Sequence, residues 1–291
     1  MVIRLTRDLK FLFFVFLLSI ATVIQVIPMC RAQSTDNNKI PLPVIMYHQI
    51  TENKKRVNKY CILKSVLEED LKYIARSGYT AITVEELLDH MEKNTPLPEK
   101  PIMITFDDGF ESIKEYVLPL LEKYNMKAVV SVVGDYADDS EKQNNRSVSY
   151  SYLTWDDIAK LVKDERVEIQ NHSYSFHSIT KSRKGAGKSP GEDEDTYRKL
   201  LSEDINRFQN KLYSLSGYRS TAFTYPFGSF SQCSGDILKE NGYSVAFICS
   251  EKMNYIDRSD REWLLKIGRY NRDASYSTYS FFQKALKTEN Q

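Results

Sequence analysis

The sequence predicts an α/β protein whose parallel strands form a single barrel or closed sheet. From Pro43 onward, short apolar segments alternate with amphipathic helical segments about seven times, which is typical of a parallel sheet covered by helices. Polar or ionisable residues directly follow several of the apolar segments. The carboxyl ends of parallel strands are where the active sites of such proteins lie. A domain of this size can bury a core without disulfides or structural metals.

The expected elements follow from apolar spacing and from capping residues. Thr83 with Glu86, and Thr154 with Asp157, are spaced to cap the first turn of a helix. Strands are expected at 44–47, 80–82, 102–106, 128–133, 167–171, 222–225, 244–248 and 264–267. Helices are expected at 65–77, 83–92, 111–124, 154–163, 196–215, just before 242 and at 277–287. Polar loops are expected at 94–100, 135–151 and 181–195.

The overall composition is that of an ordinary globular protein. Of the 291 residues, 42% are apolar and 27% are charged, and the net charge of +1 comes without an acidic or basic tail, which argues against a nucleic-acid partner. The four cysteines contain no C-x-x-C pair, so neither a disulfide framework nor a cysteine zinc site is expected. Cys249 ends an apolar run and is expected to be a buried thiol.

The N-terminal segment has the pattern of an export signal. Arg4, Arg7 and Lys10 precede an apolar stretch at 11–28, and small residues flank a candidate cleavage site before Gln33. We expect residues 1–32 to be a signal peptide. The length of the apolar stretch keeps an uncleaved membrane anchor as the alternative, and a lipoprotein is the third choice.

The domain organisation follows from this segment. Residues 33–42 are expected to be a polar linker and residues 43–291 the main domain. The main domain is then secreted or anchored at the outer face of the cytoplasmic membrane. We expect it to be a monomer that contacts the membrane only through the N-terminal segment.

Two adjacent carboxylates end the most apolar expected strand. Asp107 and Asp108 follow the run at 102–106 and precede Gly109. Neighbouring side chains on an extended chain point to opposite sides, so one acid can bind a metal while the other moves a proton. The alternative is a plain turn with two solvated acids.

Two of the four histidines, His172 and His177, lie five residues apart after another expected strand. Two histidines and one carboxylate, with an open position for water, make a hydrolytic metal site. Polar loop residues are the alternative, but two such clusters at matching strand ends favour a site. Tyr225-Pro226-Phe227-Gly228 also follows a strand and could supply a backbone N–H to an oxyanion and an apolar wall, although alone it is equally a plain turn.

Taken together, these motifs resemble the polysaccharide deacetylase (NodB-like) family, carbohydrate esterase family 4. The resemblance rests on three motifs in this order: Thr105-Phe106-Asp107-Asp108-Gly109, His172 with His177, and Tyr225-Pro226-Phe227-Gly228. Met46-Tyr47-His48 and the five-residue histidine spacing resemble, more narrowly, the branch that deacetylates poly-β-1,6-N-acetylglucosamine. The similarity extends over residues 43–269.

The resemblance implies a distorted (β/α)7 barrel that hydrolyses N-acetyl groups with a divalent metal, most often zinc, with cobalt or nickel as alternatives. It implies that Asp108, His172 and His177 hold the metal and that Asp107 is the general base. Tyr225, Pro226 and Phe227 would border the substrate, with the Phe227 N–H at the oxyanion. The implied substrate is an extracellular N-acetylglucosamine polysaccharide, first poly-β-1,6-N-acetylglucosamine. Peptidoglycan or chitooligosaccharides are alternatives, and a catalytically weak carbohydrate-binding homologue is the rival function.

Two departures from the family pattern leave the general acid open. Many members have an arginine where this chain has Thr224, and many have a late Leu-x-His motif where this chain reads Leu264 to Arg269 without a histidine. His48, at the end of the first expected strand, is the candidate replacement by position and chemistry. The alternative for His48 is a structural hydrogen bond at the barrel rim.

Overall fold

The computed structural model describes residues 39–287. The expected signal or anchor at 1–32 and most of the expected linker lie outside these residues. Residues Ile40–Leu42, expected to end the linker, instead form strand β1, which pairs antiparallel with β11 (Asn254–Ile256). Among residues 39–287, no helix is both long enough and apolar enough to cross a membrane.

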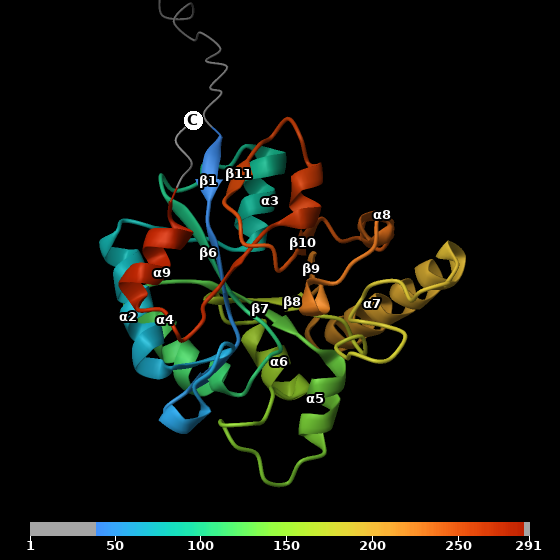
Figure 1. Ribbon diagram of the computed structural model, residues 1–291, viewed down its shortest axis with the longest axis horizontal. Helices are drawn as coiled ribbons and strands as arrows, with labels where there is room; N and C mark the ends of the chain where they lie inside the picture. Colours follow the sequence, from blue (N-terminus) through green and yellow to red (C-terminus); the bar gives the residue numbers. More distant parts are fainter. Residues whose placement is uncertain (1–38, 288–291) are drawn as a thin grey trace, which may run out of the picture. The chain divides into compact units, whose positions relative to one another are not determined.

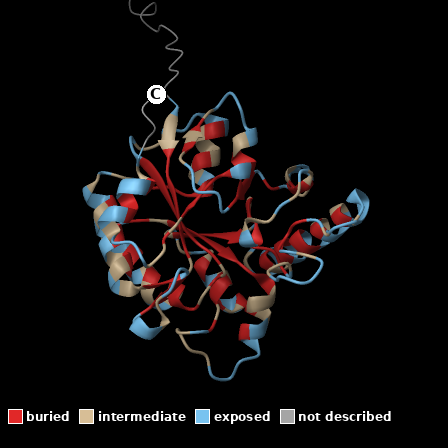
Figure 2. Cartoon of the chain, in the orientation of Figure 1, coloured by how far each residue is buried: buried red, intermediate tan, exposed pale blue. Residues whose placement is uncertain are grey.

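The centre of the domain is an eight-stranded parallel sheet (Figure 1). Its order is β10-β9-β8-β7-β6-β2-β12, and β5 pairs with β6. The strands are β2 (Val44–Tyr47), β5 (Thr80–Ala81), β6 (Pro101–Phe106), β7 (Ala128–Val132), β8 (Val167–Asn171), β9 (Ala222–Thr224), β10 (Val245–Phe247) and β12 (Tyr270–Asn271). Every residue of β6, β7 and β8 is buried, as expected for strands covered on both faces (Figure 2).

One segment near the C-terminus closes the sheet into a distorted barrel. Ile267 exchanges backbone hydrogen bonds with β10, donating to Ala246 O and accepting from Ile248 N, both at 2.9 Å. A few residues later, β12 pairs with β2 on the opposite edge. The predicted α/β barrel is therefore confirmed in a distorted form, as a curled sheet whose two edges are bridged by this one segment.

The prediction of a strand at 264–267 is wrong. Residues Glu262–Lys266 form a short 3-10 helix, η4, whose Leu264 and Leu265 are buried, and the closing segment begins only at Ile267. A short apolar run does not by itself distinguish a strand from a buried helical turn.

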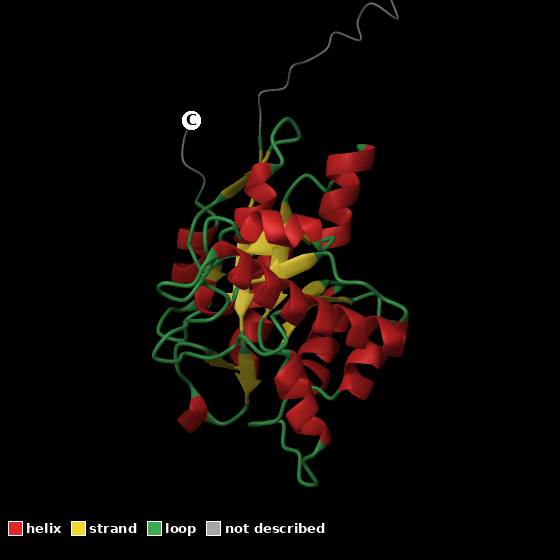
Figure 3. Ribbon diagram, turned by 90° about the vertical axis from the view of Figure 1, so that its right-hand side faces the viewer, coloured by secondary structure: helices red, strands yellow, loops and turns green. Residues whose placement is uncertain are grey.

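Helices surround the sheet (Figure 3). They are α2 (Lys64–Arg76), α3 (Val84–Lys93), α4 (Leu118–Tyr124) with the preceding π-helical turn η2 (Ile113–Val117), α5 (Gly134–Glu141), α6 (Trp155–Leu161), α7 (Glu194–Ser216), α8 (Ser234–Glu240) and α9 (Thr278–Ala285). The capping boxes of Thr83 with Glu86 and of Thr154 with Asp157 are both present. The first half of the expected loop 135–151 is instead helix α5.

Two small elements complete the domain above the carboxyl ends of the strands. β3 (Gln49–Thr51) and β4 (Cys61–Leu63) form a separate parallel pair, and the connection between them carries the short helix η1 (Lys54–Arg56). A 3-10 turn, η3 (Pro226–Gly228), follows β9. Both elements help to frame the cleft described next.

Candidate active site

A cleft of about 840 Å³ opens where the carboxyl ends of the barrel strands meet. Its lining includes the predicted site residues His48, Asp107, Asp108, His172, His177, Tyr225 and Phe227. Pro226, the remaining predicted residue, is buried and is absent from the lining. Motifs that are separated by up to 179 positions, from His48 to Phe227, are therefore brought together by the parallel topology.

Three candidate metal ligands converge at one point of this cleft. Asp108 Oδ1 lies 3.1 Å from His177 Nε2 and 3.5 Å from His172 Nε2. The candidate ligand atoms of the three residues lie within 4.8 Å of one another. Asp108 adopts a left-handed conformation (φ 70°) before Gly109 (φ 74°), which turns the chain sharply at the end of β6.

The hydrogen bonds around these residues leave the lone pairs of His172 Nε2 and Asp108 Oδ1 directed toward each other. His172 Nδ1 lies 2.7 Å from Thr224 O, and a carbonyl only accepts, so Nδ1 carries the proton and the neutral ring presents the Nε2 lone pair. Asp108 Oδ1 is buried and has no hydrogen-bond partner. Such a set needs a positive charge between its members, and its donor types fit a divalent metal.

The electrostatics of the site also favour a cation at this point. Burial raises the pKa of Asp108, but the imidazoles of His172 and His177, when protonated at Nε2, outweigh it and hold that pKa well below its usual range. Burial lowers the pKa of His172, whereas Asp108 and Asp107 raise it, with a net upward shift. The carboxylate therefore stays ionised, and its field attracts positive charge.

Asp107 is held in a different way from its neighbour. Arg269 donates from Nη1 to Asp107 Oδ1 at 2.7 Å and from Nη2 to Oδ2 at 2.8 Å, and both side chains are buried. Burial raises the pKa of Asp107, but the Arg269 guanidinium more than offsets this and lowers it. Asp107 is therefore an ionised carboxylate, oriented by a bidentate pair and facing the cleft.

Sequence reasoning missed Arg269. Arg269 lies in the segment that closes the barrel. It is the last residue of 264–269, the region where many family members have the Leu-x-His motif. A buried arginine gives no local signal, because only the tertiary structure places its carboxylate partner, 162 positions earlier in the chain.

His48 follows β2 and lines the same cleft. Its Nδ1 is buried without a hydrogen-bond partner, and its ring meets Tyr60 edge-on with 4.9 Å between the centroids. Burial lowers the pKa of His48, although Asp107 and Asp108 raise it. The unpartnered Nδ1 does not fit the alternative of a structural hydrogen bond through that nitrogen.

The Tyr-Pro-Phe-Gly turn borders the candidate metal ligands. Phe227 has a left-handed backbone (φ 56°), and its ring centroid lies 4.5 Å from that of His177. A Cβ at Gly185 would lie 2.3 Å from Pro226 O, so the expected surface loop 181–195 packs directly on this turn.

Backbone strain is concentrated at this site. Five non-glycine residues among those described have positive φ: Asn94, Asn125, Asp108, Ser173 and Phe227. The two asparagines are helix C-caps, where this conformation is common. The other three follow or belong to the predicted motifs, which is where strained backbone typically marks function.

Cys249 differs from its prediction. It lines the cleft and is exposed rather than buried, because its apolar run ends at the rim of the barrel. Cys61 and Cys233 are also free thiols.

Comparison with known proteins places the chain in a family. The family model for polysaccharide deacetylase matches residues 94–246, more than half of the chain. The poly-β-1,6-N-acetyl-D-glucosamine N-deacetylase of Escherichia coli K12 is 23% identical over 221 residues, covering 70% of this chain and 33% of that protein. The enzyme of the same name from Staphylococcus aureus MSSA476 is 21% identical over 200 residues, covering 69% of this chain and 65% of that protein.

The chain therefore spans about a third of the first relative's length and just under two thirds of the second's. A solved structure of a de-N-acetylase from Aggregatibacter actinomycetemcomitans has the same fold, with a TM-score of 0.72 and 22% identity. The match covers 83% of this chain and 99% of that one. With the family match over residues 94–246, the chain belongs to the polysaccharide deacetylase family.

Proposed function

We propose that this protein is a metal-dependent N-deacetylase of an N-acetylglucosamine polysaccharide, with poly-β-1,6-N-acetylglucosamine as its substrate. The observation that carries the proposal is the convergence of Asp108, His172 and His177 beside the arginine-anchored Asp107. One carboxylate and two imidazoles can hold a metal, while a second carboxylate remains free for proton transfer. The bond broken is the amide C–N bond of the acetamide group, not a peptide bond.

In this proposal Asp108, His172 and His177 hold a divalent metal. Their donor set of one oxygen and two nitrogens suits zinc, with cobalt or nickel as alternatives. When bound, the metal lowers the pKa of a water and polarises the acetamide carbonyl.

The protein's own residues supply the proton transfers. Asp107, kept ionised by Arg269, accepts a proton from the attacking water. His48, which follows β2 and lines the same cleft, donates a proton to the leaving amine. The Phe227 N–H donates to the carbonyl oxygen as negative charge develops there.

The choice of substrate rests on the cleft and on the relatives. The cleft is open, and Tyr60 and Phe227 present partly exposed aromatic rings along its lining, which suits sugar rings of an extended chain. The two named relatives act on poly-β-1,6-N-acetyl-D-glucosamine. Such a polymer lies outside the cell, in agreement with the export signal expected at residues 1–32.

The test is acetate release by the purified full-length chain. Oligomers of poly-β-1,6-N-acetylglucosamine are compared with chitooligosaccharides and peptidoglycan, each with zinc and with a chelator. We expect chelator-sensitive release that is fastest with the β-1,6-linked oligomers. Faster release from another glycan would overturn the substrate, and release that no chelator reduces would overturn the metal dependence. Zinc binding without release from any glycan would favour the rival function of a carbohydrate-binding homologue.

A further inference from the structure

We infer that Tyr136 is a positioning residue that holds the imidazole of His177 with its Nε2 lone pair directed at the metal. This inference rests on the proposed metal site. Tyr136 lies on α5, in the stretch expected to be a polar loop, and it was not among the predicted site residues.

One hydroxyl contacts two polar atoms of His177. Tyr136 Oη lies 2.9 Å from His177 Nδ1 and 3.4 Å from the His177 carbonyl oxygen. The carbonyl can only accept. With the hydroxyl proton directed at it, Oη accepts from Nδ1–H at the shorter distance, and we take this arrangement. A neutral imidazole that is protonated at Nδ1 has its lone pair at Nε2, the atom that lies 3.1 Å from Asp108 Oδ1.

The orientation of His177 depends more on its hydrogen bond to Tyr136 than the orientation of His172 depends on its hydrogen bond to Thr224 O. The partner of His172 is the backbone carbonyl of Thr224 in the sheet, which a side-chain change cannot remove. The partner of His177 is a side chain on a helix outside the sheet. The orientation of His177 is therefore set by how firmly α5 and Tyr136 are held.

The N-terminus of α5 is docked on the chain between the two histidines. Gly134 N donates to Ser173 O at 3.1 Å, and Asp135 N donates to Tyr174 O at 2.8 Å. A Cβ at Gly134 would lie 2.6 Å from the Tyr174 ring, so only glycine permits this approach. These contacts hold helix α5 against the segment between His172 and His177.

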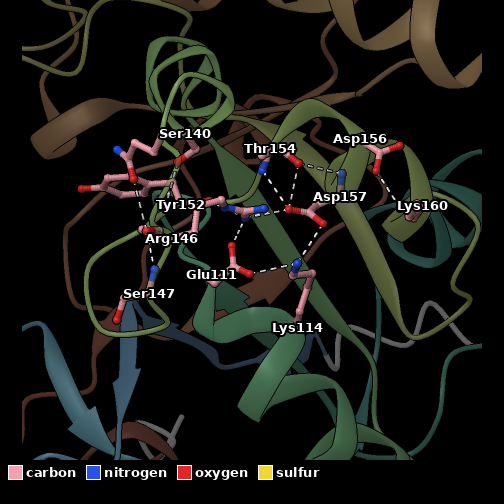
Figure 4. A network of polar contacts seen from close by, with 12 residues as sticks. Glu111, Lys114, Ser140, Arg146, Ser147, Tyr152, Thr154, Asp156, Asp157 and Lys160 are labelled. Carbon is pink, nitrogen blue, oxygen red and sulfur yellow. Dashed lines mark hydrogen bonds and ion pairs between the residues drawn. The ribbon is translucent and has the colours of Figure 1, made fainter.

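The ring of Tyr136 is fixed from the other side by Tyr152. The two ring centroids lie 4.4 Å apart, and Tyr152 in turn stacks on Phe110. The backbone of Tyr152 is held at both polar groups: its N–H donates to Ser140 Oγ at 3.1 Å, and its carbonyl accepts from Arg146 Nη2 at 3.1 Å (Figure 4).

Arg146 belongs to a half-buried ion network. It pairs with Glu111 and with Asp157, and Lys114 contacts the same two carboxylates (Figure 4). Several charges that form a network contribute more to stability than single surface pairs do. The network therefore holds Tyr152 in place. Tyr152 in turn packs against the ring of Tyr136, whose hydroxyl contacts His177.

The experiment is a zinc titration of the full-length chain and two variants, in competition with a chromophoric chelator. Tyr136→Phe removes only the hydroxyl, and outer-sphere partners of metal ligands are typically worth 10- to 100-fold in affinity, so we expect zinc to bind about 10- to 100-fold more weakly. Tyr213→Phe, which removes the hydroxyl of an exposed tyrosine on α7, should leave zinc affinity unchanged.

A spectroscopic readout separates positioning from a general loss of structure. In the zinc-loaded protein, the side-chain Nδ1–H protons of His172 and His177 should both be protected from exchange with solvent. In Tyr136→Phe the His177 signal should lose its protection, while the His172 signal, bonded to Thr224 O, should keep it.

Equal zinc affinity of wild type and Tyr136→Phe would overturn the inference and leave the proposed metal site standing. An equal loss in Tyr213→Phe, or loss of both histidine signals in Tyr136→Phe, would also overturn it, because the effect would then be structural. A wild-type protein that binds no zinc, cobalt or nickel would overturn the proposed function itself and the inference with it.

Discussion

Two buried aspartate–arginine pairs flank strand β12, and they differ in what surrounds the carboxylate. Arg269 and Arg272, one on each side of the strand, are both fully buried and contact both oxygens of an aspartate, Asp107 and Asp70 respectively. Asp70 also accepts hydrogen bonds from Tyr47 Oη at 3.1 Å and from Thr278 Oγ1 at 2.6 Å. Asp107 has Arg269 as its partner and faces the cleft.

The two carboxylates differ in how many of their lone pairs are already occupied by hydrogen-bond donors. Asp70 links α2 to the C-terminal segment. Its lone pairs accept hydrogen bonds from Arg272, Tyr47 and Thr278. Asp107 is anchored by one guanidinium and retains lone pairs that can accept a proton. The same pair of residue types is thus enclosed by further donors in one place and faces the cleft in the other.

The largest expected effect comes from Asp107→Asn. An amide cannot serve as a general base, and general acid–base catalysis is typically worth about 10²- to 10⁴-fold, so acetate release should fall by about that factor. Initial rates of acetate release measure it. Asp70→Asn is the matched control and should keep wild-type turnover per folded molecule. Equal losses in both variants would show that the two pairs do not divide their roles as described.

Asp70→Ala should be the most destabilising of these changes. It leaves the Arg272 guanidinium buried without its partner, and breaking a buried pair in this way costs about 3–5 kcal/mol of unfolding free energy. Denaturant unfolding measures the loss. The control is Asp139→Ala, which removes an exposed pair with Lys142 and should cost at most about 1 kcal/mol. A similar cost for both variants would argue against a structural role for the inner pair.

Glu168 sharpens the comparison, because this buried carboxylate has no guanidinium. It accepts from Val84 N at 2.6 Å and Glu85 N at 3.1 Å at the start of α3. Burial raises its pKa from 4.5 to about 7, although these N–H groups lower it. Between pH 4.5 and 7 the folded state therefore keeps a proton that the unfolded chain has released.

Stability should consequently fall as pH rises from 4.5 through 7. The loss is at most about 3.5 kcal/mol, since the pKa differs by about 2.5 units and one unit corresponds to about 1.4 kcal/mol. Glu168→Gln should remove this slope, as measured by denaturant unfolding at a series of pH values. An unchanged slope in the variant would assign the pH dependence to other groups.

The sequence predicted what is encoded locally. The two aspartates and the two histidines follow apolar strands, and parallel topology brings such strand ends together without further information. His48 and Phe227 were placed in the cleft by the same reasoning.

Residues that act through tertiary contacts could not be predicted in this way. Tyr136 lies in a stretch that begins with glycine and contains three aspartates, a composition typical of a loop. It is helical because its N-terminus docks on residues 173–174. Arg269 lies beside a strand of only two residues, too short for a periodic signal.

The central claim is that adjacent aspartates divide metal binding from proton transfer. The most direct measurement is a zinc titration of the full-length Asp107→Asn and Asp108→Asn variants beside wild type. We expect Asp107→Asn to bind zinc about as tightly as wild type while losing turnover, and Asp108→Asn to lose both. Equal loss of zinc affinity in the two variants would contradict the division of roles.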